Sequence, residues 1–129
     1  ISNQINGNFI ILWGKPSEKI ISEKIKLLTP GVCIVNKLSL NKLKALISQV
    51  DLVIGPDTGP THMAWALNVA SITLFGPTPG YRNTYVTKVN KIIESKSKVD
   101  PLKINKNDFS IKDIDIQEII QVSQDLLDQ

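Results

Sequence analysis

Near the middle of the chain, a strand-like run meets a helix at a junction rich in polar side chains. Residues 51–55 read as a buried strand, and the helix that follows begins near residue 60. Between them stand Asp57, Thr58 and Gly59, with a histidine three residues further on. A helix start presents unpaired backbone N–H groups and a positive dipole end, which together attract anions. The junction therefore predicts an anion site flanked by groups that could orient a ligand.

A second apolar strand, residues 71–75, ends in the loop 76–80, which reads Gly-Pro-Thr-Pro-Gly. Two parallel strands would deliver both loops to one edge of a sheet, where open α/β folds bind ligands. From this loop Thr78 could reach a phosphate or a sugar. The residues that we expect to line one cleft at this edge are Asp57, Thr58, Gly59 and His62.

Each of these residues also has a purely structural interpretation. An Asp before a helix commonly satisfies nearby amides in the turn, and Thr58 with Gly59 could form an ordinary helix cap. The first-turn position of His62 favours a neutral, hydrogen-bonding imidazole. A lone histidine is often a satisfied surface or core group, but the spacing from Asp57 favours ligand contact, with little role as a general base.

The elements that must position this junction alternate along the chain. We expect strands at 9–12, 32–35 and 91–94, helices at 16–28 and 39–50, and a last helix from about 115 to 128, capped by Asp115 with Glu118. This order predicts one α/β domain, 1–129, with a Rossmann-like, mostly parallel sheet. The helix residues that we expect to be buried are Ile21, Ile25, Leu28, Leu40, Leu43, Leu46, Ile47, Val50, Ile116, Ile119, Ile120, Val122 and Leu126 or Leu127.

Composition limits the classes of function. A chain of 129 residues, 42% hydrophobic, can form one compact core, and no apolar run approaches the ~20 residues of a membrane span. The net charge of +3 is interpreted either as solvated lysines or as attraction to an anionic membrane surface or acidic glycolipid. Aromatic residues are only 5% and do not alternate with basic ones, which argues against nucleic acid.

The sequence predicts neither a metal nor a cofactor. It has one histidine, one cysteine and no cluster of carboxylates that would form a metal cage. The pair Asp113 and Asp115 matches an Asp-x-Asp metal motif superficially, but it falls at the expected cap of the last helix. Cys33 lies in an apolar run and is expected to be a buried free thiol, and Trp13 and Trp65 are expected to be core residues.

Several motifs give the chain a resemblance to the bacterial heptosyltransferases of glycosyltransferase family 9. The central matches are Asp57-Thr-Gly-x-x-His62, the alanines at 64 and 66, and Phe75-Gly-Pro-Thr78. Upstream, Trp13-Gly-x-Pro-x-Glu18 and Lys37-Leu-Ser39 resemble the segments that lie along the nucleotide in the heptosyltransferase I branch. The loop after residue 75 lacks the acidic residue that the family usually carries between the equivalents of Thr78 and Pro79.

The resemblance implies the C-terminal, donor-binding half of an inverting transferase of the GT-B type. Its donor would be ADP-L-glycero-D-manno-heptose and its acceptor the Kdo-lipid A inner core of lipopolysaccharide, with the enzyme peripheral at the cytoplasmic face of the inner membrane. The implied donor-binding residues are Asp57, Thr58, Gly59, His62, Glu18 for the ribose, Leu38 for the adenine, and Thr78. No catalytic residue is expected in this chain, because the carboxylate base belongs to an N-terminal acceptor domain.

Some alternatives stay open. Glu18 also suits the start of a helix for dipole reasons alone, and Leu38 could belong to an ordinary strand-to-helix turn. The resemblance implies a further strand and helix ahead of Phe9, which this chain, opening at Ile1, lacks. We expect a cut from a longer protein, the alternative being a fragment that completes its sheet by dimerisation or swapping. The rival functions are a non-catalytic nucleotide-sugar binding module and another sugar-nucleotide enzyme, such as an epimerase. The sequence upstream of Ile1 would discriminate among them.

Overall fold

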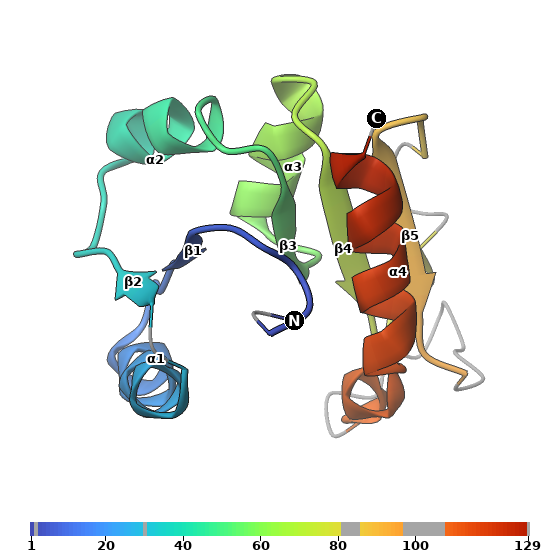
Figure 1. Ribbon diagram of the computed structural model, residues 1–129, viewed down its shortest axis with the longest axis horizontal. Helices are drawn as coiled ribbons and strands as arrows, with labels where there is room; N and C mark the ends of the chain where they lie inside the picture. Colours follow the sequence, from blue (N-terminus) through green and yellow to red (C-terminus); the bar gives the residue numbers. More distant parts are fainter. Residues whose placement is uncertain (2, 30, 81–85, 97–107, 129) are drawn as a thin grey trace. The chain divides into compact units, whose positions relative to one another are not determined.

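A computed structural model describes residues 1, 3–29, 31–80, 86–96 and 108–128 (Figure 1). By their contacts the residues divide into two compact units, Ile1–Leu43 and Lys44–Gln129, which are described one at a time. The sequence predicts a surface loop at 95–110, and most of it lies outside the described residues, since 97–107 are not among them.

The first unit is a parallel strand pair joined by a helix. Strands β1 (Phe9–Ile11) and β2 (Val32–Ile34) pair in parallel, with Ile10 opposite Cys33. Helix α1 (Pro16–Leu28) connects them and begins with a proline, which suits the first helical turn because the N–H there has no helical acceptor. The strands and the helix predicted for this part of the sequence are therefore present.

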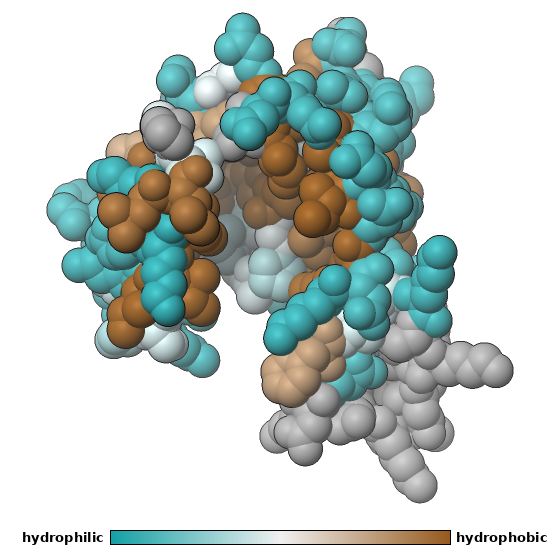
Figure 2. All heavy atoms as spheres, turned by 60° about the horizontal axis from the view of Figure 1, so that its bottom comes forward, coloured by the Kyte–Doolittle hydropathy of each residue, from teal (hydrophilic) through white to brown (hydrophobic). Residues whose placement is uncertain are grey.

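The burial expected for the first unit was wrong. Ser22 is the buried residue of α1, whereas Ile21, Ile25 and Leu28 are 58%, 41% and 85% exposed. Figure 2 shows hydrophobic side chains gathered over α1, at the left of the view. Each strand beneath the helix has three residues, so the pair offers little apolar surface to cover. Cys33 is also exposed, because alternate residues of a strand face opposite sides and the buried neighbour is Val32.

The second unit is built on a three-stranded parallel sheet. Helix α2 (Leu40–Ile47) crosses the boundary between the units; its Ile47 is buried, while Leu40, expected to be buried, is 68% exposed. Strands β3 (Val53–Pro56), β4 (Ser71–Phe75) and β5 (Asn90–Glu94) pair in that order, all parallel. The single sheet expected from the sequence is thus found as two hydrogen-bonded sheets, with β1 and β3 each paired on one side within the described residues.

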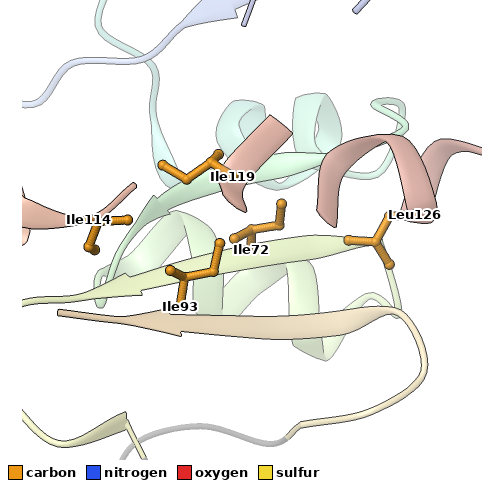
Figure 3. Packing of buried hydrophobic residues seen from close by; sticks show 5 residues of the cluster. All are labelled: Ile72, Ile93, Ile114, Ile119 and Leu126. Atoms are coloured by element: carbon orange, nitrogen blue, oxygen red, sulfur yellow. The ribbon is translucent and has the colours of Figure 1, made fainter. Parts of the chain in front are cut away.

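The core of the second unit lies between this sheet and the last helix, α4 (Ile116–Leu127) (Figure 3). A short 3-10 turn, η2 (Ser110–Asp113), precedes α4. The buried cluster consists of Ile72, Ile93, Ile114, Ile119 and Leu126. Asp115 caps α4 as expected, accepting a hydrogen bond from the Gln117 amide at 2.9 Å. Ile116 was expected to be buried but is 61% exposed, because it stands at the helix start, one turn before the first buried residue.

Helix α3 (Gly59–Ala66) covers the opposite face of the sheet. Ile72 and Leu74 face α4, so the alternating residues Thr73 and Phe75 point the other way, and both are buried. A methyl group at Gly55 would lie 3.4 Å from Cγ2 of Thr61, so α3 packs closely over the end of β3. The described part of the chain contains no helix long and apolar enough to cross a membrane.

Candidate functional site

The candidate site begins where two neighbouring parallel strands end. Pro56, the last residue of β3, lies opposite Leu74 of β4, and β4 stops one residue later. The turn that carries Asp57 and the loop that carries Thr78 therefore leave the sheet at the same edge. This is the arrangement that the sequence predicted for these two segments.

Thr61 holds the turn between β3 and α3. Its Oγ1 lies 2.7 Å from the Thr58 carbonyl oxygen and 2.9 Å from that of Pro56, so its single hydroxyl proton serves one of the two at a time. The same oxygen accepts from the Thr58 amide at 3.3 Å. Thr61 is 1% exposed and was not singled out from the sequence. Its place three residues after the helix cap, the capping-box position, is the signal that could have found it.

Asp57 and His62 are brought together on the accessible side of this turn. Oδ1 of Asp57 lies 2.6 Å from Nε2 of His62, and the two side chains are 19% and 48% exposed. With Nε2–H donating to the carboxylate, Nδ1 accepts in the neutral imidazole and donates in the imidazolium. The pair can therefore present an acceptor to a sugar hydroxyl or a donor to a phosphate. As a partly exposed pair it contributes at most about 1 kcal/mol to stability.

Trp65 supports His62 from one helical turn below. The two rings stack with centroids 4.5 Å apart and planes 18° from parallel. Trp65 was expected to be a core residue, but it is half-buried and takes part in the site's structure. Its Nε1 is buried without a hydrogen-bond partner within the described residues. We call Asp57, His62 and Trp65 the His62 cluster; the three-residue spacing of its two rings on a helix was the missed signal.

Thr58 and Gly59 lie at the exposed start of α3. Thr58 is the extended N-cap residue, with φ −145°, and its hydroxyl makes a long contact of 3.4 Å to the Pro56 carbonyl oxygen. A Cβ at Gly59 would meet no heavy atom within 4 Å. Packing therefore does not require glycine at this position, and the space in front of the backbone is open.

Glu18 caps the helix to which it belongs. Its Oε2 accepts from the Gly14 amide at 2.7 Å and the Lys15 amide at 3.0 Å. The Gly14 hydrogen bond, followed by that of Lys15, holds the pKa of this exposed carboxyl below its ordinary value, because both bonds favour the charged form. Glu18 and the half-buried Leu38 belong to the first unit, and the His62 cluster belongs to the second.

The described residues contain no group of three or more His, Cys, Asp or Glu side chains that could hold a metal ion. Of the Asp-x-Asp pair, Asp115 serves as the cap of α4, which is the structural role expected for it.

Comparison with known proteins gives a consistent set of similarities. The model of glycosyltransferase family 9 (heptosyltransferase) matches residues 1–108. A lipopolysaccharide heptosyltransferase 1 of Campylobacter coli is 40% identical over 119 residues, which are 88% of this chain and 35% of that protein. The Escherichia coli K12 protein of the same name is 35% identical over 77 residues, 57% of this chain and 23% of that protein. The chain thus spans about a third, or less, of these relatives' length.

A solved structure shares the fold. The E. coli heptosyltransferase WaaC, determined with ADP, aligns with a TM-score of 0.67 at 19% identity, over 89% of this chain and 33% of that one. The parallel sheets with their helices are therefore the Rossmann-like α/β arrangement of a GT-B heptosyltransferase, as the sequence predicted.

Replacing Glu18 by Gln should make the stability of the chain depend less on pH. A carboxyl with a lowered folded pKa stabilises the fold above its ordinary pKa and loses that contribution as pH falls through the folded value. Urea unfolding at a series of pH values should show the parent more stable than Glu18→Gln at neutral pH, with the gap closing in acid. A gap that is constant or grows in acid would contradict the capping role.

The stacking in the His62 cluster should be measurable as a coupling energy. In a double-mutant cycle of His62→Ala and Trp65→Leu, we expect about 0.5–1.5 kcal/mol of coupling by urea unfolding, the usual worth of a ring pair beyond its buried area. The same cycle with Trp65→Phe is the matched control. Because phenylalanine keeps a ring and part of the stacking, this cycle should give a smaller coupling energy than the cycle with Trp65→Leu. Additive single effects for Trp65→Leu would show that the rings do not support each other.

Proposed function

This chain belongs to glycosyltransferase family 9, the heptosyltransferases, and from that premise we propose that it forms the donor-binding half of a lipopolysaccharide heptosyltransferase. The donor in this proposal is ADP-L-glycero-D-manno-heptose, and the acceptor is the Kdo-lipid A inner core. The named relatives are lipopolysaccharide heptosyltransferases, which supports the reaction class. The chain spans about a third of them, so the activity is proposed for the full-length protein.

The observation that carries this proposal is the Asp57–His62 pair at the open start of α3. His62 contacts Oδ1 of Asp57, and in this proposal the Asp57 carboxylate accepts from a sugar hydroxyl while Nδ1 of His62 provides a second polar contact. The backbone N–H of Gly59 and the weakly held hydroxyl of Thr58 supply donors for the diphosphate. Thr78, on the loop that follows the neighbouring strand β4, is assigned to the same donor.

The nucleotide part of the donor is assigned to the first unit. Glu18 uses Oε2 for its own helix, so we assign Oε1 to the ribose hydroxyls. Leu38, half-buried after β2, provides an apolar wall for adenine. Support for ADP comes from the family motifs at these two positions and from the fold shared with the ADP-bound E. coli protein.

The proposed reaction is a single displacement that inverts the configuration at the anomeric carbon of the donor sugar. A carboxylate base takes the proton of the acceptor hydroxyl, whose oxygen attacks the anomeric carbon as the bond from that carbon to the diphosphate breaks. Charge on the departing ADP is stabilised by the N–H groups and dipole of the α3 start, so the proposal needs neither metal nor cofactor. The base is assigned to the acceptor domain, outside these 129 residues.

The proposal places the full-length enzyme peripherally at the cytoplasmic face of the inner membrane. Its acceptor is a lipid there, and the net charge of +3 on this chain suits an anionic surface. No part of the proposal involves nucleic acid.

Preference for adenine tests the donor assignment. Because an acid for the ribose and an apolar wall for the base suit ADP and provide no group dedicated to uracil, the full-length protein should bind ADP more tightly than UDP. Isothermal titration calorimetry with both nucleotides measures the difference in affinity. Glu18→Ala should weaken the binding of ADP. Equal affinities, or tighter binding of UDP, would contradict the proposed heptosyltransferase function, and only the assignment of the fold would remain.

Substitution of the Asp57–His62 pair tests the role of the site. In the full-length enzyme, Asp57→Ala and His62→Ala should each lower the turnover rate. The expected loss of transition-state stabilisation is about 2–4 kcal/mol, which is typical for removal of one well-placed polar group. Asp57→Ala should be worse, because it removes a sugar contact and an acceptor of the turn. Steady-state rates and thermal melting measure both effects.

The matched control is Asp51→Ala, an exposed carboxylate just ahead of the other end of β3, which should leave the rate unchanged. Activity of the parent should also survive a chelator. Normal turnover and melting of Asp57→Ala would show that the junction is structural, and chelator sensitivity of the parent would refute the metal-free reaction.

A further inference from the structure

The loop that carries Thr78 is fastened at both of its ends by the residues where β5 stops. At one end, Oγ of Ser95 donates to the Gly76 carbonyl oxygen at 3.1 Å, and the Ser95 amide donates to the Phe75 carbonyl oxygen at 2.8 Å. At the other end, the Gly80 amide donates to Oε1 of Glu94 at 2.7 Å. The last residue of β5 and the residue after it therefore hold the five-residue loop that follows β4. We call residues 76–80 the Thr78 loop.

The ends of the Thr78 loop are also tightly enclosed. A Cβ at Gly76 would lie 2.9 Å from Cβ and 3.0 Å from the backbone N of Ile111. A Cβ at Gly80 would lie 2.9 Å from Oε1 of Glu94 and 3.0 Å from Cδ1 of Ile92. Both positions are buried. The Ile111 backbone requires glycine at position 76, whereas the atoms nearest to Gly80 belong to side chains, which would have to shift to admit a Cβ.

The interior of the loop has little freedom of its own. Pro77 and Pro79 flank Thr78, and each proline ring fixes its φ near −65°. With both ends fastened and both neighbours stiff, the position of Thr78 depends on the two attachments to β5. Of the two residues that make these attachments, Glu94 is exposed. Its carboxylate accepts the hydrogen bond from the loop and is not part of the hydrophobic core.

We infer that Glu94 and Ser95 are positioning residues for the donor site, holding the Thr78 loop where Thr78 meets the nucleotide sugar. The inference rests on the proposed function for the role of Thr78, but the fastening itself rests on contacts among the described residues. A carboxylate suits this task because a charge-assisted hydrogen bond to an amide is stronger than a neutral one. A preformed loop binds its ligand without the cost of ordering it at that moment.

Hydrogen exchange on the full-length protein tests the fastening without any assay of activity. Pro77 and Pro79 have no amide hydrogen, so exchange within the loop reports on Gly76, Thr78 and Gly80 alone. Glu94→Ala should speed exchange in this loop by about tenfold, with β3 and α3 unchanged. Glu94→Gln keeps a side-chain oxygen as acceptor and should restore most of the protection. Parent-like exchange in Glu94→Ala would overturn the inference.

Kinetics then test whether the fastened loop matters to the donor. Glu94→Ala should raise KM for ADP-heptose by about tenfold with a smaller change in kcat, and Glu94→Gln should stay within about twofold of the parent. An active parent with an unchanged KM in Glu94→Ala would overturn the positioning role. If the parent shows no turnover with ADP-heptose, the proposed function fails, and the exchange measurement alone decides whether Glu94 fastens the loop.

Discussion

The parallel pairing of β3 with β4 determines which polar residues can meet one ligand. Because Pro56 lies opposite Leu74, the chain leaves both strands at nearly the same height of the sheet. Asp57 and the Thr78 loop follow directly from these ends. A shift of one residue in this register would turn Ile72 away from α4 and Thr73 toward it, at the cost of the apolar cluster. The hydrophobic packing under α4 therefore also fixes the geometry of the candidate site.

Most of the candidate site residues are already engaged by neighbours before any ligand is bound. Asp57 holds His62, and Glu18 accepts two amides at the start of its own helix. In Glu18 the oxygen Oε2 makes these contacts, and Oε1 extends from the same fixed group. Structural and ligand-binding roles, which the sequence presents as alternatives, are compatible here. A side chain held by one oxygen loses less rotamer freedom when the other binds.

The sequence predicted what depends on local pattern and missed what depends on partners. Short apolar runs identified every described strand, and Asp115 marked the start of α4 because capping is a local property. The inward faces of helices were less predictable. Ile21, Ile25 and Leu28 recur at helical spacing, but burial also requires a surface to cover them, which β1 and β2 are too short to provide.

The same distinction applies to the site. The motif around Asp57 and His62 is visible in the sequence because all its members lie between residues 57 and 62. The contact between Glu94 and Gly80 spans 14 residues and depends on the register of β4 with β5, so no local pattern indicates it. Trp65 was placed in the core because large aromatic residues usually are, and its stacking on His62 follows from the rotation of α3.

Exposure separates the residues that can touch a ligand from those that hold them. His62 is 48% exposed, whereas Thr61, which ties the turn beneath it, is 1% exposed, and Phe75, which leads into the Thr78 loop, is also 1% exposed. Loss of a polar group at the rim leaves water to replace it, but loss of the Thr61 hydroxyl would remove its contacts to the Pro56 and Thr58 carbonyl oxygens and the acceptor of the Thr58 amide. The rim can therefore change its chemistry within this fold while the buried layer cannot. This difference in exposure allows the edge of one parallel sheet to carry polar residues that suit a ligand, while the buried residues beneath them meet the requirements of packing.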